Sequence, residues 1–169
     1  MGEGGDGGDG ATGRLVAVDI DPASLAGSRP FLEAERLVAM EDLIATDNRF
    51  LPVGGTGAYR LLISLADGKL VLDVSDEAGA PVVRHILSLK PLSRVVRDYF
   101  LICQTYESTV GMVSPARFEA IDMGRRGVHD EGATLLMDRL AGKIDMDFAT
   151  ARRLFTLVCA LNWRDRHEA

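Results

Sequence analysis

The chain has 169 residues, of which 47% are hydrophobic, and a formal net charge of -6 at pH 7. This length fits one domain whose core needs neither disulfides nor a metal. The acidic balance argues against a broad basic surface for the nucleic-acid backbone. No signal-like segment opens the chain and no apolar run is long enough to span a membrane, so we expect a soluble, cytoplasmic protein.

Residues 1–13 are rich in glycine and poor in apolar side chains. Such a segment does not bury enough apolar surface to offset the entropy of ordering it. The sequence therefore predicts a disordered tail at 1–13, followed by a single α+β domain over 14–169.

Cys103 and Cys159 are the only cysteines, and neither belongs to a Cys-x-x-Cys pair. Both lie on apolar faces of predicted helices, which favours reduced core thiols over a disulfide or zinc ligands. We expect neither a metal nor another cofactor.

The first part of the chain contains one strand and one helix. Arg14 to Ile20 is rich in valine and isoleucine and predicts a strand, and a helix follows over 30–46. Its apolar face is predicted to contain Phe31, Ala34, Leu37, Val38, Met40, Ile44 and Ala45. The glycine-rich stretch 48–57 is interpreted as a connector, because no Lys-Ser/Thr follows the glycines and a strand comes next.

Residues 58–89 predict three antiparallel strands, over about 58–66, 69–76 and 82–89, because Asp67-Gly68 is a hairpin signal between alternating segments. Matching the apolar faces places Asp73 opposite Arg84 as an exposed ion pair. His85 falls on the apolar face near Leu72, where we expect a partly buried, hydrogen-bonded histidine rather than a ligand.

A helix over 91–110 has apolar residues at three- and four-residue steps and is predicted to lie across the apolar face of the sheet. Ser114-Pro115 predicts the start of the next helix. Gly124 and Gly127 predict a break in that helix, because each costs up to about 1 kcal/mol in a helix interior. A further helix is then expected from about 128 to 140.

The chain ends with a short alternating stretch, 143–148, and a helix over about 148–163. Apolar residues cover most of the circumference of this helix, so it should lie at the centre of the helical layer or at a homodimer contact. Arg152 and Arg153 lie in its first turn, where the helix dipole disfavours cations, and Asp145 and Asp147 are the acids expected near them.

The segment 121–132 concentrates charge and glycine. If a helix begins near Gly127, its free amides lie beside Arg125 and Arg126, and with His129 they form a site for phosphate or carboxylate. The alternative is a corner between two helices whose arginines pair with Asp122, Asp130 or Glu131. Asp130 and Glu131 would compete with an added anion.

His129 and Glu131 are also the acid-base candidates of an enzyme that acts on a small anionic metabolite. A metal site is not expected, because neighbouring residues on a helix do not share a face and no second histidine or cysteine completes a set.

Three segments carry a resemblance to a known family: IDMGRRGVHDEG, DEAGAPVVRHILSLKPLSRVVRDYFLIC before it, and DFATARRLFTLVCALNW after it. Through them the chain resembles the uncharacterised protein family UPF0262 of alphaproteobacteria over nearly all of 14–163. The resemblance implies a cytoplasmic bacterial protein and no particular activity. The glycine-rich tail departs from the usual start near Arg14.

The sequence thus predicts an α+β fold in which an antiparallel sheet of three or four strands packs against helices, with a helical C-terminal half. The place of the first strand stays open. The leading hypothesis is a non-enzymatic binding or regulatory domain whose surface at 124–131 holds a small anion. The alternatives are the small enzyme and a nucleic-acid binder that uses Arg125, Arg126, Arg152 and Arg153.

Overall fold

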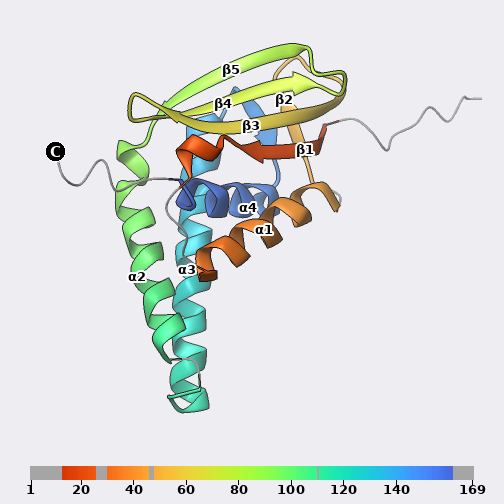
Figure 1. Ribbon diagram of the computed structural model, residues 1–169. Helices are drawn as coiled ribbons and strands as arrows, with labels where there is room; N and C mark the ends of the chain where they lie inside the picture. The colour runs from red at the N-terminus through yellow and green to blue at the C-terminus, as the bar shows by residue number, and fades with distance from the viewer. Residues whose placement is uncertain (1–12, 26–29, 46–47, 110, 162–169) are drawn as a thin grey trace, which may run out of the picture.

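The structure, a computed structural model, describes residues 13–25, 30–45, 48–109 and 111–161. Its elements are β1 (Arg14–Ile20), η1 (Pro22–Ser24), α1 (Pro30–Ala45), β2 (Phe50–Pro52), β3 (Ala58–Ala66), β4 (Lys69–Asp76), β5 (Pro81–Ser88), η2 (Lys90–Leu92), α2 (Ser93–Thr109), α3 (Pro115–Leu140), β6 (Ile144–Met146) and α4 (Phe148–Cys159). The chain is α+β with a largely helical C-terminal half, as predicted (Figure 1).

The predicted tail lies outside the described residues except at its last position. There the Gly13 amide donates to the carbonyl of Gly57 at 2.7 Å, and the Gly13 carbonyl accepts from the amide of Phe50 at 2.6 Å. Gly13 is therefore part of the fold, which begins one residue earlier than predicted.

Four strands form one sheet in the order β1-β3-β4-β5, while β2 pairs with β6 in a second, two-stranded sheet. The antiparallel β3-β4-β5 arrangement confirms the prediction, and both Asp67 and Gly68 adopt the positive φ angles that a tight hairpin turn requires. β1 joins parallel to β3, so the larger sheet is mixed rather than antiparallel. β2 also corrects the prediction that 48–57 is only a connector.

The strand register agrees with the sequence pattern. Asp73 lies opposite Arg84, and the Arg84 Nε donates to Asp73 Oδ1 at 2.5 Å. His85 lies opposite Leu72 and is partly buried, as expected. Its Nε2, however, is buried without a hydrogen bond to any described residue, so the predicted hydrogen bond is missing at this nitrogen. Burial, followed by the charge of Lys143, lowers the pKa of His85.

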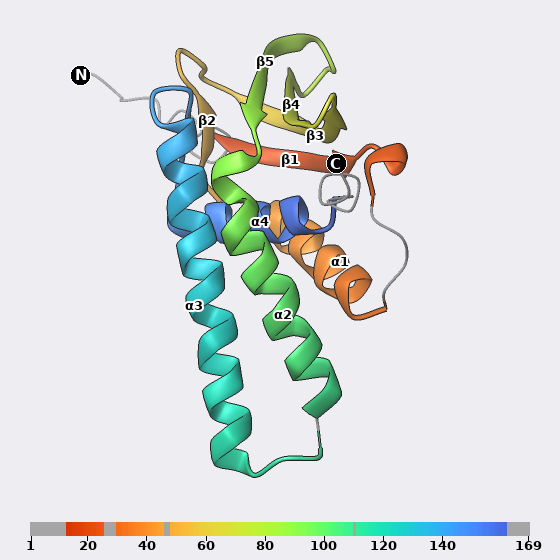
Figure 2. The ribbon, with the colours of Figure 1, turned by 90° about the vertical axis from the view of Figure 1, so that its left-hand side faces the viewer.

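The helices form two groups. α1 and α4 lie beside the sheet, whereas α2 and α3 form an antiparallel hairpin that extends away from it (Figures 1 and 2). The prediction that the 91–110 helix lies across the sheet is therefore wrong. Only four residues of α2 are buried: Val95, Val96, Tyr99 and Cys103. The rest of its apolar stripe packs along α3, because the hairpin leaves the sheet.

The apolar face predicted for α1 is also wrong. Leu37, Val38 and Ile44 are exposed, and Ala39 and Leu43 are the buried residues of this helix. Contact with β1 and α4 turns the helix by part of a turn relative to the predicted face. None of the described helices is long and apolar enough to cross a membrane.

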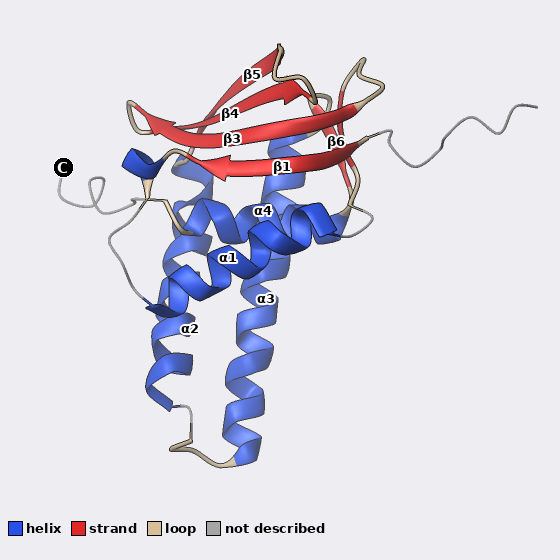
Figure 3. Cartoon of the chain, turned by 45° about the vertical axis from the view of Figure 1, so that its right-hand side comes forward, coloured by secondary structure: helices blue, strands red, loops and turns tan. Residues whose placement is uncertain are grey.

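α4 is the central helix of the layer, as Figure 3 shows. All of Leu154–Cys159 is buried, and so are Thr150 and Ala151. The chain itself covers the apolar circumference that suggested a homodimer contact. α4 ends at Cys159 rather than at 163, and the end of the predicted helix, with Trp163, lies outside the described residues. Cys103 and Cys159 are both buried and free, as predicted.

α3 is one continuous helix of 26 residues that begins at the predicted Ser114 cap. The predicted break at Gly124 and Gly127 is therefore wrong, and the amides near Gly127 are inside a helix instead of free at its start. Packing against α2 and α4 offsets the helix-breaking tendency of these glycines, because tertiary contacts override intrinsic propensity. An anion site at 124–131 cannot use these amides.

Candidate anion-binding site

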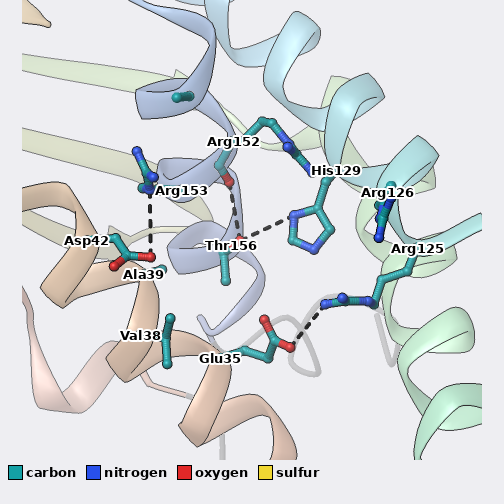
Figure 4. A pocket seen from close by; sticks show the side chains of 11 residues that line it. Glu35, Val38, Ala39, Asp42, Arg125, Arg126, His129, Arg152, Arg153 and Thr156 are labelled. Atoms are coloured by element: carbon teal, nitrogen blue, oxygen red, sulfur yellow. Dashed lines mark hydrogen bonds and ion pairs between the residues drawn. The ribbon is translucent and has the colours of Figure 1, made fainter. Parts of the chain in front are cut away.

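Three helices enclose a pocket of about 200 Å³ beside the predicted central segment (Figure 4). Its lining residues are Glu35, Val38, Ala39 and Asp42 from α1, Arg125, Arg126 and His129 from α3, and Ala149, Arg152, Arg153 and Thr156 from α4. On α1 and α4 they recur at three- and four-residue steps, so each helix presents one face to the pocket. The pocket thus brings four arginines and a histidine together.

A close approach of α3 and α4 positions these side chains. Gly132 of α3 lies directly under the ring of Phe155, where an added Cβ would come within 2.4 Å of the ring carbon Cδ2. Glycine is therefore required for this approach. It sets the Arg125 to His129 face of α3 against the start of α4.

Arg125 connects α3 to α1. Its guanidinium lies 3.1 Å from Asp122 Oδ1 and 3.2 Å from Glu35 Oε1, and it packs over the ring of Tyr106 at 5.2 Å. Two carboxylates and an aromatic face therefore hold this side chain, which is only 24% exposed. Arg125 is mainly a structural cation of the pocket wall.

Arg153 is held in a similar way. It donates to Asn48 Oδ1 at 2.7 Å and lies 3.9 Å from Asp42 Oδ2. The partner expected from the sequence was Asp145 or Asp147, and this expectation is wrong. These two acids lie at the other side of the α4 start because β2 pairs with β6 there, and Asp145 instead pairs with Arg49 at 2.8 Å.

Arg126 and Arg152 are held less firmly. Arg126 is 68% exposed and its one ion pair, at 2.9 Å, is with Asp122, a carboxylate that Arg125 also uses. Arg152 is 38% exposed and lies 3.1 Å from Asp130. These two guanidiniums are the ones with donors available to a bound anion.

His129 lies at the inner wall of the pocket and is only 8% exposed. Its ring packs edge-on against Tyr99, with a centroid distance of 5.1 Å, and against Phe155 at 6.2 Å. Its Nδ1 lies 3.4 Å from Thr156 Oγ1. The imidazole is therefore fixed by aromatic packing on one side and by a hydroxyl on the other.

Burial and then the charges of Arg152 and Arg125 lower the pKa of His129 to about 4, although Asp130 raises it. The imidazole is consequently neutral at pH 7. Its lowered pKa also indicates that the local potential is positive, which is the potential that stabilises an anion.

The structure separates the remaining predicted site residues from the pocket. Gly127 does not line it, and no described atom lies within 4 Å of the position of an added Cβ. Glu131 forms an ion pair with Arg94 of α2. Asp130 and Glu131 thus turn to Arg152 and Arg94, and neither competes at Arg125 or Arg126 as anticipated.

Sequence reasoning missed Glu35, Asp42 and Thr156. Their only signal is helical spacing, since Glu35 and Asp42 are seven residues apart and Thr156 follows Arg152 by four. Among the described residues no three His, Cys, Asp or Glu side chains are grouped so that they could hold a metal ion.

The comparisons with known proteins identify the family. The model of the uncharacterised protein family UPF0262 matches residues 12–164. The chain belongs to the UPF0262 family. A UPF0262 protein of Azorhizobium caulinodans is 56% identical over 154 residues, which cover 89% of this chain and 94% of that protein.

Other members of the UPF0262 family are similarly close. A UPF0262 protein of Xanthobacter autotrophicus is 54% identical over 153 residues, covering 89% of this chain and 93% of its own length. One of Mesorhizobium japonicum is also 54% identical over 153 residues, covering 89% and 94%. No solved structure matches the chain. The UPF0262 resemblance predicted from the three sequence segments is confirmed.

Proposed function

We propose that this UPF0262 protein is a non-enzymatic binding domain for a small anion, held in the pocket between α1, α3 and α4. The observation that carries the proposal is the convergence of arginines from two helices on one cavity. Arg126 and Arg152 provide the ligand contacts, while Arg125 and Arg153 build the wall. A planar guanidinium suits both carboxylate and phosphate oxygens, because it offers two parallel donors.

The charge around the pocket is balanced rather than strongly positive. Each arginine has a carboxylate partner: Glu35, Asp42, Asp122 or Asp130. An incoming anion must therefore share or displace one of them. Arg126 requires the least displacement, because Asp122 keeps its contact with Arg125.

A binding role is favoured over the alternative of an enzyme. A histidine with a pKa of about 4 is a weak general base at neutral pH, since an efficient one has a pKa near the working pH. The other acid-base candidate, Glu131, pairs with Arg94 outside the pocket. The two groups do not act on one ligand.

The nucleic-acid alternative is supported less well. Arg125, Arg126, Arg152 and Arg153 do gather in one place, but they line a cavity of about 200 Å³. This size suits a small ion better than a polymer backbone.

The test compares two arginine variants of α3. Arg126→Ala removes the exposed guanidinium, whereas Arg139→Ala removes an exposed arginine in the last turn of the same helix, outside the pocket. Calorimetric titration with inorganic phosphate and with dicarboxylates should give a dissociation constant at least about tenfold higher for Arg126→Ala, since a charge-assisted contact contributes roughly 1.5–3 kcal/mol. Arg139→Ala should bind as the parent does.

Arg126 is the better probe than Arg125, because loss of Arg125 would also remove the connection between α1 and α3. Equal affinities of the two variants would contradict the proposal. So would the absence of any binding or thermal stabilisation of the parent protein, because a ligand of the native state raises its stability.

A further inference from the structure

One buried polar atom of the pocket has no partner among the described residues. His129 is 8% exposed, and Nδ1 is the only ring nitrogen with a hydrogen-bonding neighbour, Thr156. Figure 4 shows the other nitrogen, Nε2, on the side of the ring that faces Glu35 and Arg125 across the cavity. A buried polar atom that is aimed into a cavity needs a partner from whatever occupies it.

The hydrogen bonds of Thr156 determine what kind of partner this is. The hydroxyl of Thr156 donates its single hydrogen to the carbonyl of Arg152, at 3.2 Å. Toward His129 the hydroxyl is therefore an acceptor, and Nδ1 carries the ring proton. In a neutral imidazole Nε2 is then the acceptor.

We propose that the site selects anions that carry a hydroxyl group, such as hydrogen phosphate or a small hydroxycarboxylate, over anions of similar size and charge without one. This inference rests on the proposed anion binding and adds the ligand class. The guanidiniums of Arg126 and Arg152 hold the charged oxygens, and His129 Nε2 accepts the hydrogen bond of the ligand hydroxyl.

The discrimination arises from the ligand that does not fit. Sulfate at neutral pH, or a dicarboxylate without a hydroxyl, turns an oxygen lone pair toward Nε2 and leaves two acceptors facing each other. A site built to bond a hydroxyl rejects the analogue that lacks it, because the buried polar atom stays unpaired. Burial keeps the imidazole neutral, so it does not become a donor that would accommodate sulfate.

Glu35 is the other acceptor near the ligand. It is 27% exposed and bonded to Arg125 at 3.2 Å. A hydroxyl could donate to its free oxygen as well, so the experiment has to separate the histidine from the glutamate.

The experiment measures the affinities of matched anion pairs for the full chain by calorimetry at pH 7.5. The pairs are phosphate with sulfate, and malate with succinate, which also distinguishes a phosphate from a hydroxycarboxylate as the preferred ligand. We expect at least about tenfold tighter binding of the hydroxyl-bearing member of one pair or both.

Two variants assign that ratio to His129. His129→Phe keeps a ring against Tyr99 and Phe155 but has no acceptor, so the ratio should fall to near one while sulfate or succinate binds as before. Thr156→Val has nearly the same shape as threonine and removes the acceptor for Nδ1. Thr156 is thus a positioning residue, and its loss should lower the ratio without loss of the arginine contacts.

Nitrogen-15 NMR of the imidazole reads the tautomer directly, independent of any ligand. Nε2 should be unprotonated in the parent and partly protonated in Thr156→Val. An Nε2-protonated parent overturns this inference, as does equal affinity within both pairs or an unchanged ratio in His129→Phe. If both members of each pair bind equally but Arg126→Ala still weakens them, anion binding stands and only the selectivity fails. If no anion binds, both proposals fail.

Discussion

The two halves of α3 lie in different environments although they belong to one helix. α3 is described over its whole length, and its buried residues are His129, Gly132, Ala133, Leu136 and Leu140, all in the second half. The first half lies in the hairpin with α2, away from the sheet (Figure 2). The charges and glycines of 121–128 mark the place where a continuous helix leaves the body of the protein. They do not mark the end of a helix.

Glycine has opposite roles in these two halves. Gly132 is needed because Phe155 occupies the space of a side chain, whereas the space next to Gly127 is empty of described atoms. The same residue type therefore indicates close packing in one half and has no steric cause within the described chain in the other. Three predictions test this contrast.

The largest effect should come from pH acting on the packed half. The pKa of His129 is about 4 in the folded protein and 6.5 in the unfolded chain. Above pH 6.5 both states are neutral and stability does not change. As the pH falls from 6.5 to 4, the unfolded chain binds a proton that the folded protein does not, so about 3 kcal/mol of stability is lost.

Urea unfolding at pH 7.5 and pH 4.5 measures this loss. His129→Phe should lose less stability than the parent over the same interval, because the carboxylates that also titrate are common to both proteins. Equal losses would show that His129 is not buried as a neutral group.

The next effect should come from Gly132→Ala. The added Cβ would meet the ring of Phe155, which is fully buried and packs against Tyr99 at 5.9 Å and His129 at 6.2 Å, so the ring has little room to shift. Overpacking of this kind costs about 1–3 kcal/mol, in spite of the better helix propensity of alanine. Denaturant unfolding measures it, and an unchanged or raised midpoint would contradict the close approach of α3 and α4.

The local parts of the fold could be predicted from the sequence. The β3-β4-β5 meander and the Asp73-Arg84 pair follow from one turn and an alternating pattern within 32 residues, 58–89. The parallel pairing of β1 with β3 and the position of α2 away from the sheet could not be predicted. They depend on which apolar faces meet across long stretches of chain, and periodicity does not specify the partner of a face.

The candidate site divides in the same way. Arg125, Arg126 and His129 were predicted because they are neighbours in sequence. Glu35 and Thr156 were not, because only the packing of α1 and α4 against α3 brings them there. The predicted anion site thus keeps its arginines and its histidine but loses the backbone amides, since the helix does not break.

The smallest effect should come from Gly127→Ala, and its sign is opposite to that of Gly132→Ala. No described atom lies within 4 Å of the added Cβ, and the residue is helical, so alanine should raise stability by about 0.4–1 kcal/mol through the lower entropy of its unfolded chain. Anion affinity should stay unchanged, because Gly127 does not line the pocket. The same unfolding and titration experiments measure both quantities. A loss of stability would mean that something outside the described chain covers this face of α3, and a loss of affinity would return Gly127 to the site as the sequence first suggested.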